Sequence, residues 1–144
     1  MKYSEVLYDT SVFIGYDLPK PAGWLSAVVL QELAVGANGR AGLQRLAALR
    51  QDYQTRGRLL LPDVEAWWIA GRVLNHLLSD LSRQDKGRRR PRLSDAKKQS
   101  LIRDTLIAVS AKQQGVTVIS DNEDFPLIQS YYKFRWLTGK DFFG

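Results

Sequence analysis

The stretch Val116-Thr117-Val118-Ile119-Ser120-Asp121 is the clearest strand signal in the chain, and the interpretation of the other segments builds on it. Its β-branched residues favour extended backbone, and a short apolar run of this kind is typical of a buried strand. Gly115, directly before it, ends a predicted helix whose N-cap is Ser94. A long helix that leads into a buried strand is the expected unit of an α/β fold.

The same alternation of strands and helices extends over the whole chain. Further strands are expected at residues 5–9, within 24–29, at 59–61 and at 134–137. Further helices are expected at residues 31–35, 41–56, 62–82 and around 125–132. This order predicts a parallel sheet that is covered by helices on both faces. Because no linker or internal repeat interrupts the pattern, we expect one domain over residues 1–144.

The composition narrows the class of protein. The 144 residues include no cysteine, which excludes a disulfide framework, a thiolate zinc site and a cysteine nucleophile. No apolar run is long enough to span a bilayer, and the first residues lack the layout of a secretory signal. We therefore expect a cytoplasmic protein with no membrane partner. The formal net charge of +6 favours a polyanionic partner without identifying it.

Acids follow two of the expected strands. Asp9 comes directly after Val6-Leu7-Tyr8, and Asp121 follows the strand quoted above, with Asn122 and Asp124 close behind. In a parallel α/β sheet, ligands bind beyond the carboxyl ends of the strands. The sequence thus places these acids where a functional site is expected.

Two further acids lie in apolar helical surroundings. Glu32 is flanked by Val28-Val29-Leu30 and by Leu33-Ala34-Val35, and Asp104 lies within an equally apolar segment. A helix that is apolar on nearly every side is buried, and a buried carboxylate needs a partner or a cation. Arg103 is not expected to pair with Asp104, because neighbouring side chains on a helix point in different directions.

Carboxylates that converge without matching bases repel one another, and a hard divalent cation resolves that repulsion. Mg²⁺ and Mn²⁺ prefer carboxylate and water ligands, and such an ion activates water for attack on a phosphodiester. Taken alone, each acid also has an ordinary explanation as a turn residue, an exposed helix residue, half of an ion pair or a helix cap. The order and surroundings of the acids together favour metal-assisted phosphodiester hydrolysis.

With these acids in place, the chain resembles a PIN domain, and more narrowly the VapC-type toxin ribonucleases of bacterial toxin–antitoxin pairs. Residues 6–14 resemble the opening strand of the family, with its first acid and the hydroxyl residues that follow. Residues 26–37 resemble the second motif, in which a serine leads into the helix that carries the glutamate. Residues 103–111 and 115–125 resemble the third and fourth motifs. The match spans almost the whole chain.

The resemblance implies a three-layer α/β/α sandwich and Mg²⁺- or Mn²⁺-dependent cleavage of RNA. It implies that Asp9, Glu32 and Asp104 bind the metal or orient metal-bound water, and that Thr10 and Ser11 form hydrogen bonds there. It also implies an antitoxin partner that blocks the site, and a homodimer. The alternative is a PIN-like module that binds RNA or protein without catalysis.

The fourth acidic position is left open between two residues. In the family pattern, Ser120 stands for the usual threonine and Asn122 for the second polar element, while Asp124-Phe125 matches the ending. We expect both Asp121 and Asp124 to lie near the site, with one of them close to a metal.

Other residues carry weaker signals. The basic run of Arg88-Arg89-Arg90, Lys86 and Arg92 is either an RNA phosphate contact or a solvated loop. His76 is the only histidine, and a structural role is favoured for it. For Trp67 and Trp68, packing in the core or in a dimer is favoured over base stacking.

Overall fold

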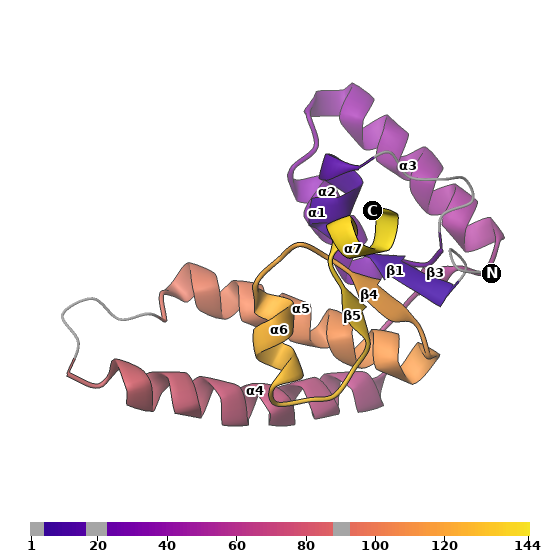
Figure 1. Cartoon of the computed structure of the whole chain (residues 1–144). Helices are drawn as coiled ribbons and strands as arrows, with labels where there is room; N and C mark the ends of the chain where they lie inside the picture. Colours follow the sequence, from indigo (N-terminus) through magenta and orange to yellow (C-terminus); the bar gives the residue numbers. More distant parts are fainter. Residues whose placement is uncertain (1–4, 17–22, 88–92) are drawn as a thin grey trace.

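The computed structural model describes residues 5–16, 23–87 and 93–144, and helices and strands alternate along it (Figure 1). The strands are β1 (Val6–Tyr8), β2 (Leu25–Ser26), β3 (Leu59–Leu60), β4 (Thr117–Ile119) and β5 (Trp136–Leu137). The helices are α1 (Thr10–Gly15), α2 (Ala27–Val35), α3 (Gly39–Thr55), α4 (Val64–Asp85), α5 (Asp95–Gln114), α6 (Asp124–Gln129) and α7 (Gly139–Phe143).

All of the paired strands are parallel, as the alternation predicted. Strand β4 lies between β1 and β5, with Leu7 opposite Val118 and Val118 opposite Trp136. Strands β2 and β3 form a second pair, and a parallel bridge between Leu7 and Trp24 joins this pair to the free edge of β1. The resulting spatial order is β3-β2-β1-β4-β5, so the chain moves outward to β3 and then returns across β1.

The helices lie on both faces of these strands, which confirms the three-layer arrangement. Helices α1 to α3 belong to the outward path from β1 to β3, and α4 to α6 to the return path through β4. Since crossovers between parallel strands are right-handed, the two paths place their helices on opposite faces. Figure 1 shows α3 on one side of the strands and α4 with α5 on the other.

Helix α5 is the central helix of the core. Its residues 104–111 are all buried, and apolar side chains such as Ile107 and Ala111 pack in the main core cluster. The start of the helix is capped as expected, since Ser94 Oγ accepts a hydrogen bond from the Lys97 backbone N–H at 3.1 Å. The end is equally defined, because Gly115 adopts a left-handed conformation with φ of 77° and leads directly into β4.

The second expected strand lies within its predicted range, but the helix after it begins earlier than expected. Residues 24–29 were expected to include a strand, with a helix only from residue 31, but β2 ends at Ser26 and α2 begins at Ala27. The reason is a cap: Ser26 Oγ accepts a hydrogen bond from the Val28 N–H at 3.1 Å and starts the helix within the apolar run. The short helices α1 and α7 were not expected, because a helix of one or two turns carries too little periodicity to be recognised.

Of the two packing alternatives for Trp67 and Trp68, the structure contradicts the core, and packing in a dimer stays a prediction. Trp67 and Trp68 are 59% and 65% exposed, because the face of α4 that packs against α5 is formed by Ala66, Ala70 and Leu74 instead.

Within the described ranges, no helix combines the length and apolar character needed to cross a membrane.

The left-handed turn at Gly115 gives a first prediction. The fold requires a left-handed conformation at residue 115. In Gly115→Ala the new Cβ makes that conformation unfavourable by about 1–2 kcal/mol, and we expect the free energy of unfolding to fall by that amount. The matched control is Gly71→Ala, in the interior of α4 with no atom near the new Cβ, which should raise stability by about 0.5–1 kcal/mol. Urea denaturation measures both, and an unchanged stability in Gly115→Ala would contradict the account.

Candidate metal centre

The central strands bring the first acid to the edge of the sheet. Asp9 follows β1 directly, and its backbone N–H donates to the Ile119 carbonyl of β4 at 3.0 Å. Ser120, directly after β4, donates from its Oγ to Asp9 Oδ2 at 2.7 Å. The ends of two strands that are more than a hundred residues apart in sequence thus fix one buried carboxylate.

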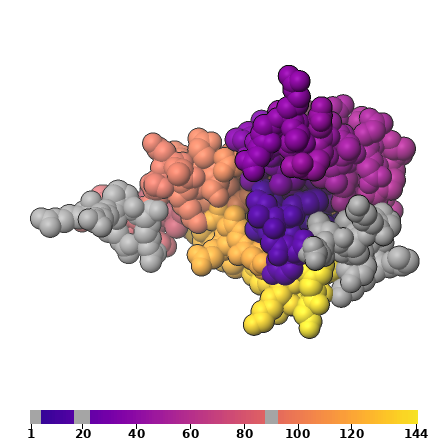
Figure 2. Space-filling view, turned by 90° about the horizontal axis from the view of Figure 1, so that it is seen from above, coloured from indigo at the N-terminus to yellow at the C-terminus, as the bar shows by residue number. Residues whose placement is uncertain are grey.

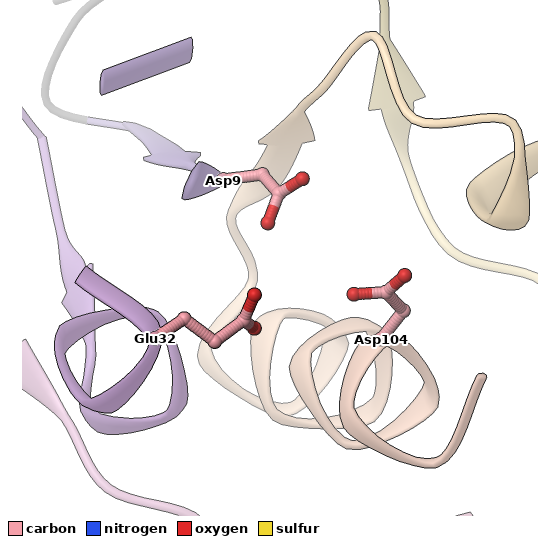
Figure 3. Close-up of side chains that lie close together, drawn as sticks. All are labelled: Asp9, Glu32 and Asp104. Carbon is pink, nitrogen blue, oxygen red and sulfur yellow. The ribbon is translucent and has the colours of Figure 1, made fainter. Parts of the chain in front are cut away.

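Two helices add further carboxylates to this edge. Glu32 extends from α2 and Asp104 from α5, and both side chains point toward Asp9 (Figure 3). One carboxylate oxygen from each of Asp9, Glu32 and Asp104 lies within 4.8 Å of the other two. Asp9 and Asp104 are buried, whereas the Glu32 side chain is 25% exposed. These distances suit three ligands of one small cation.

Burial and mutual repulsion raise the pKa values of all three carboxyl groups. At Asp9, desolvation by burial outweighs the hydrogen bond from Ser120 and raises the pKa. At Glu32, burial and then the charge of Asp9 raise the pKa. At Asp104, burial, the hydrogen bond to Asp124 and the charge of Asp9 raise the pKa to about 9. Without a cation, these surroundings therefore favour the protonated form of each carboxyl group, and most strongly that of Asp104.

The two candidates for the fourth acid lie in different surroundings. Asp124 is buried at the start of α6, and its carboxylate is coupled to Asp104. Burial alone would raise the pKa of Asp124, but hydrogen bonds from Asp104, Lys97 and Ser100 outweigh it and lower the pKa. Asp121 is exposed and is bound through its side chain to Tyr16 Oη at 2.6 Å and to the Gly139 N–H at 2.8 Å.

The structure thus brings Asp124 beside the three carboxylates, whereas the side chain of Asp121 engages the start of α7. Asp121 still touches the site through its backbone, since its N–H donates to Ser11 Oγ at 3.4 Å. Tyr16 stacks on Phe143 with ring centroids 5.0 Å apart, so these contacts attach the last residues to α1. In the space-filling view, α1 (indigo) lies between the purple α2–α3 region and the yellow C-terminal segment (Figure 2).

The expected supporting residues all contact the acids. Thr10 Oγ1 donates to Glu32 Oε2 at 3.4 Å, and Asn122 Nδ2 donates to Asp104 Oδ2 at 3.1 Å. Ser11 is hydrogen-bonded to Asp9. Ser120 binds Asp9 and also accepts from the Asn122 N–H at 3.0 Å. These bonds hold the carboxylates in a fixed orientation.

The chain matches the model of a known protein family. A family model described as PIN domain matches residues 6–130, a range that contains all of the acids discussed. The chain belongs to the PIN domain family. The resemblance seen in the motifs is therefore confirmed, and PIN domains are in general metal-dependent nucleases.

Solved structures share the fold of this PIN domain. A chain in the structure of FitAB bound to an IR36 DNA fragment is 19% identical, with a TM-score of 0.58, over 92% of this chain and 94% of that chain. A chain in DNA-bound VapBC from Salmonella typhimurium is 18% identical, with a TM-score of 0.53, over 93% and 97% of the two chains. At these identities the likeness shows the fold. The comparison with curated proteins finds no match.

Two residues near the acids of this PIN domain, Lys97 and Ser100, were not identified from the sequence. Lys97 forms an ion pair with Asp124, and Ser100 Oγ donates to Asp124 Oδ2 at 2.5 Å. Both precede Asp104 on one face of α5, at spacings of seven and four residues, so the helical period offered a signal. Arg103 Nε lies 3.8 Å from Glu32 Oε1 and does not pair with Asp104, as its position beside Asp104 indicated.

The donor set of the PIN domain fits a hard divalent cation. All three converging groups are carboxylates, which Mg²⁺ and Mn²⁺ prefer as ligands. Glu32 Oε1 is buried and receives no hydrogen bond from the described residues. A buried oxygen that lacks a donor and faces two other carboxylates is the kind of atom that a cation stabilises.

Of the remaining candidates, only Lys86 and His76 fall within the described residues, and neither contacts the acids of this site. Residues 88–92 of the basic run lie outside the described residues, and Lys86, the C-cap of α4, is exposed. His76 lies on α4, where its ring packs edge-on against Tyr131 with centroids 5.2 Å apart.

The repulsion in the PIN domain gives a prediction about Asp104. Folding raises the pKa of this carboxyl from near 3.8 to about 9, so the folded state holds a proton that the unfolded chain releases. The metal-free fold therefore loses stability as pH rises through that window. In Asp104→Asn this loss is absent, and we expect the metal-free variant to be more stable than the parent by roughly 1–2 kcal/mol at neutral pH.

Urea denaturation in the presence of a chelator measures this difference in stability at about pH 6 and again at about pH 8. The advantage of Asp104→Asn over the parent protein should be larger at the higher pH. The control is Asp95→Asn, an exposed change in the first turn of the same helix, which should lower stability by a few tenths of a kcal/mol, about 0.3. If the free energy of unfolding is higher for the parent protein than for Asp104→Asn at both pH values, the proposed repulsion between the carboxylates is refuted.

Proposed function

We propose that this PIN domain is a Mg²⁺- or Mn²⁺-dependent endoribonuclease. The observation that carries the proposal is the convergence of Asp9, Glu32 and Asp104 to within 4.8 Å at the carboxyl edge of a parallel sheet. Structural acids are normally spread apart or paired with bases, because clustering them costs stability. A cluster retained in the core is explained by the ion that it binds.

In this proposal, Asp9, Glu32 and Asp104 hold the divalent ion. When bound, the ion activates a water molecule and neutralises charge that develops on the phosphodiester. Ser120 and Asn122 orient the carboxylates of Asp9 and Asp104 through the bonds at 2.7 Å and 3.1 Å. Asp124 supports the site through its hydrogen bond to Asp104, and we do not assign Asp121 to the metal.

RNA is the substrate that we propose. The VapC-type resemblance supports RNA, and the formal net charge of +6 supports a polyanion in general. The partially exposed Glu32 marks the side from which a large substrate reaches the carboxylates, since Asp9 and Asp104 are buried.

The cellular role that we propose is the toxin of a type II toxin–antitoxin pair, with an antitoxin and a second copy of this chain as partners. Two observations support it: the VapC-type motifs of the sequence, and the shared fold with chains in the FitAB and VapBC structures. The exposed Trp67 and Trp68 on α4 are compatible with a protein contact.

Cleavage of a structured RNA with Mg²⁺ or Mn²⁺ tests the activity. We expect Asp9→Asn and Asp104→Asn each to lower the cleavage rate by on the order of a hundredfold or more, because each removes a proposed ligand. Asp95→Asn, which changes an exposed acid of α5, should cleave at the parent rate. The product of a small neighbouring gene, added in equal amount, is expected to suppress cleavage.

Two results would overturn the proposal. Cleavage that survives in both ligand variants would show that the carboxylates are not the active centre. RNA binding without any cleavage, together with no affinity for either metal, would favour the alternative of a non-catalytic binding module.

A further inference from the structure

Lys97 places a fixed positive charge beside the buried carboxylate of Asp124. Its ammonium group forms an ion pair with Asp124 Oδ1, while Ser100 Oγ donates to Asp124 Oδ2 at 2.5 Å. The Asp124 side chain is 1% exposed, whereas that of Lys97 is 40% exposed. Both oxygens of Asp124 are therefore engaged by α5 of the same chain.

This ion pair borders the metal centre directly. Asp124 is hydrogen-bonded to Asp104, and Ser100 Oγ lies 3.4 Å from Asp104 Oδ2. Asp104 thus has three neighbouring carboxylates, those of Asp9 and Glu32 and that of Asp124. The described residues place Asp9, Glu32 and Asp104 in one ligand group, and Asp124 is outside it.

The charges of the pocket favour a single divalent ion. In the part of the chain that the structure describes, two side-chain cations border the four carboxylates, Lys97 at Asp124 and Arg103 at Glu32. One divalent ion added to these two cations balances the four negative charges. A second divalent ion would leave an excess of positive charge beside the buried side chains of Asp9, Asp104 and Asp124, where unbalanced charge is costly.

We propose that Lys97 is a positioning residue that occupies, as a permanent cation, the place beside Asp104 and Asp124 where a second divalent ion would bind. The site then takes one divalent ion per chain, held by Asp9, Glu32 and Asp104. This inference rests on the metal-dependent function proposed above. An ion pair that only stabilises the fold would leave the number of bound ions independent of Lys97.

Titration with Mn²⁺, followed by the electron paramagnetic resonance signal of the free ion, counts the bound ions without any assay of activity. We expect about one Mn²⁺ per chain for the parent protein and more than one for Lys97→Met, because without the ammonium group a single divalent ion leaves the four carboxylates one positive charge short. Lys97→Arg keeps the charge and should bind about one. Lys98→Met, which removes the neighbouring exposed lysine of α5, should also bind about one.

The outcomes separate this inference from the function on which it rests. Two ions in the parent protein, or one ion in a folded Lys97→Met, overturn the role of Lys97 and leave the nuclease proposal standing. No bound ion in the parent overturns both. If circular dichroism shows that Lys97→Met does not fold, Lys97→Gln replaces it, and the parent count still decides against the inference if it is two.

Discussion

The mutual repulsion of buried carboxylates is the constraint on which the rest of this structure depends. Asp9, Glu32 and Asp104 meet within 4.8 Å in surroundings that favour the protonated form of each. A sequence that needed only a stable core would place apolar residues there. The remainder of the fold stabilises this unfavourable arrangement by packing apolar residues around it, and in the proposed function a bound divalent cation would convert the repulsion into binding free energy.

Helix α5 contributes both to the packing of the core and to the repulsion between the carboxylates. Its buried apolar residues, such as Leu101, Ile107 and Ala111, pack in the core, while Asp104 points from the same helix toward the other two carboxylates. Because Ser94 and Gly115 fix its two ends, the register of Asp104 against β1 and β4 is also fixed. The stability of the fold and the geometry of the site therefore depend on the same helix. The cap at Gly115 connects this helix to β4, whose carboxyl end lies at the site.

The sequence predicted the parts of the site that depend on local pattern. Asp9 was predicted from the strand before it, and Glu32 and Asp104 from their apolar helical surroundings; the fold brings these residues together, while their role in binding a metal stays a proposal. The choice between Asp121 and Asp124 was out of reach, because it depends on Tyr16 and Gly139, which pack against the turn from distant parts of the chain. The early start of α2 was missed because the Ser26 cap lies inside an apolar run. Lys97 and Ser100 lie at helical spacings from Asp104, but their contacts with Asp124 depend on α6, which the fold packs against α5.

The most direct measurement of the central claim is the position of the ion itself. A crystal of the protein grown with Mn²⁺ and measured at a wavelength where manganese scatters anomalously locates that ion independently of any assay. The account predicts an anomalous peak enclosed by the carboxylates of Asp9, Glu32 and Asp104. Well-ordered carboxylates with no peak among them, in crystals soaked at saturating Mn²⁺, would contradict it.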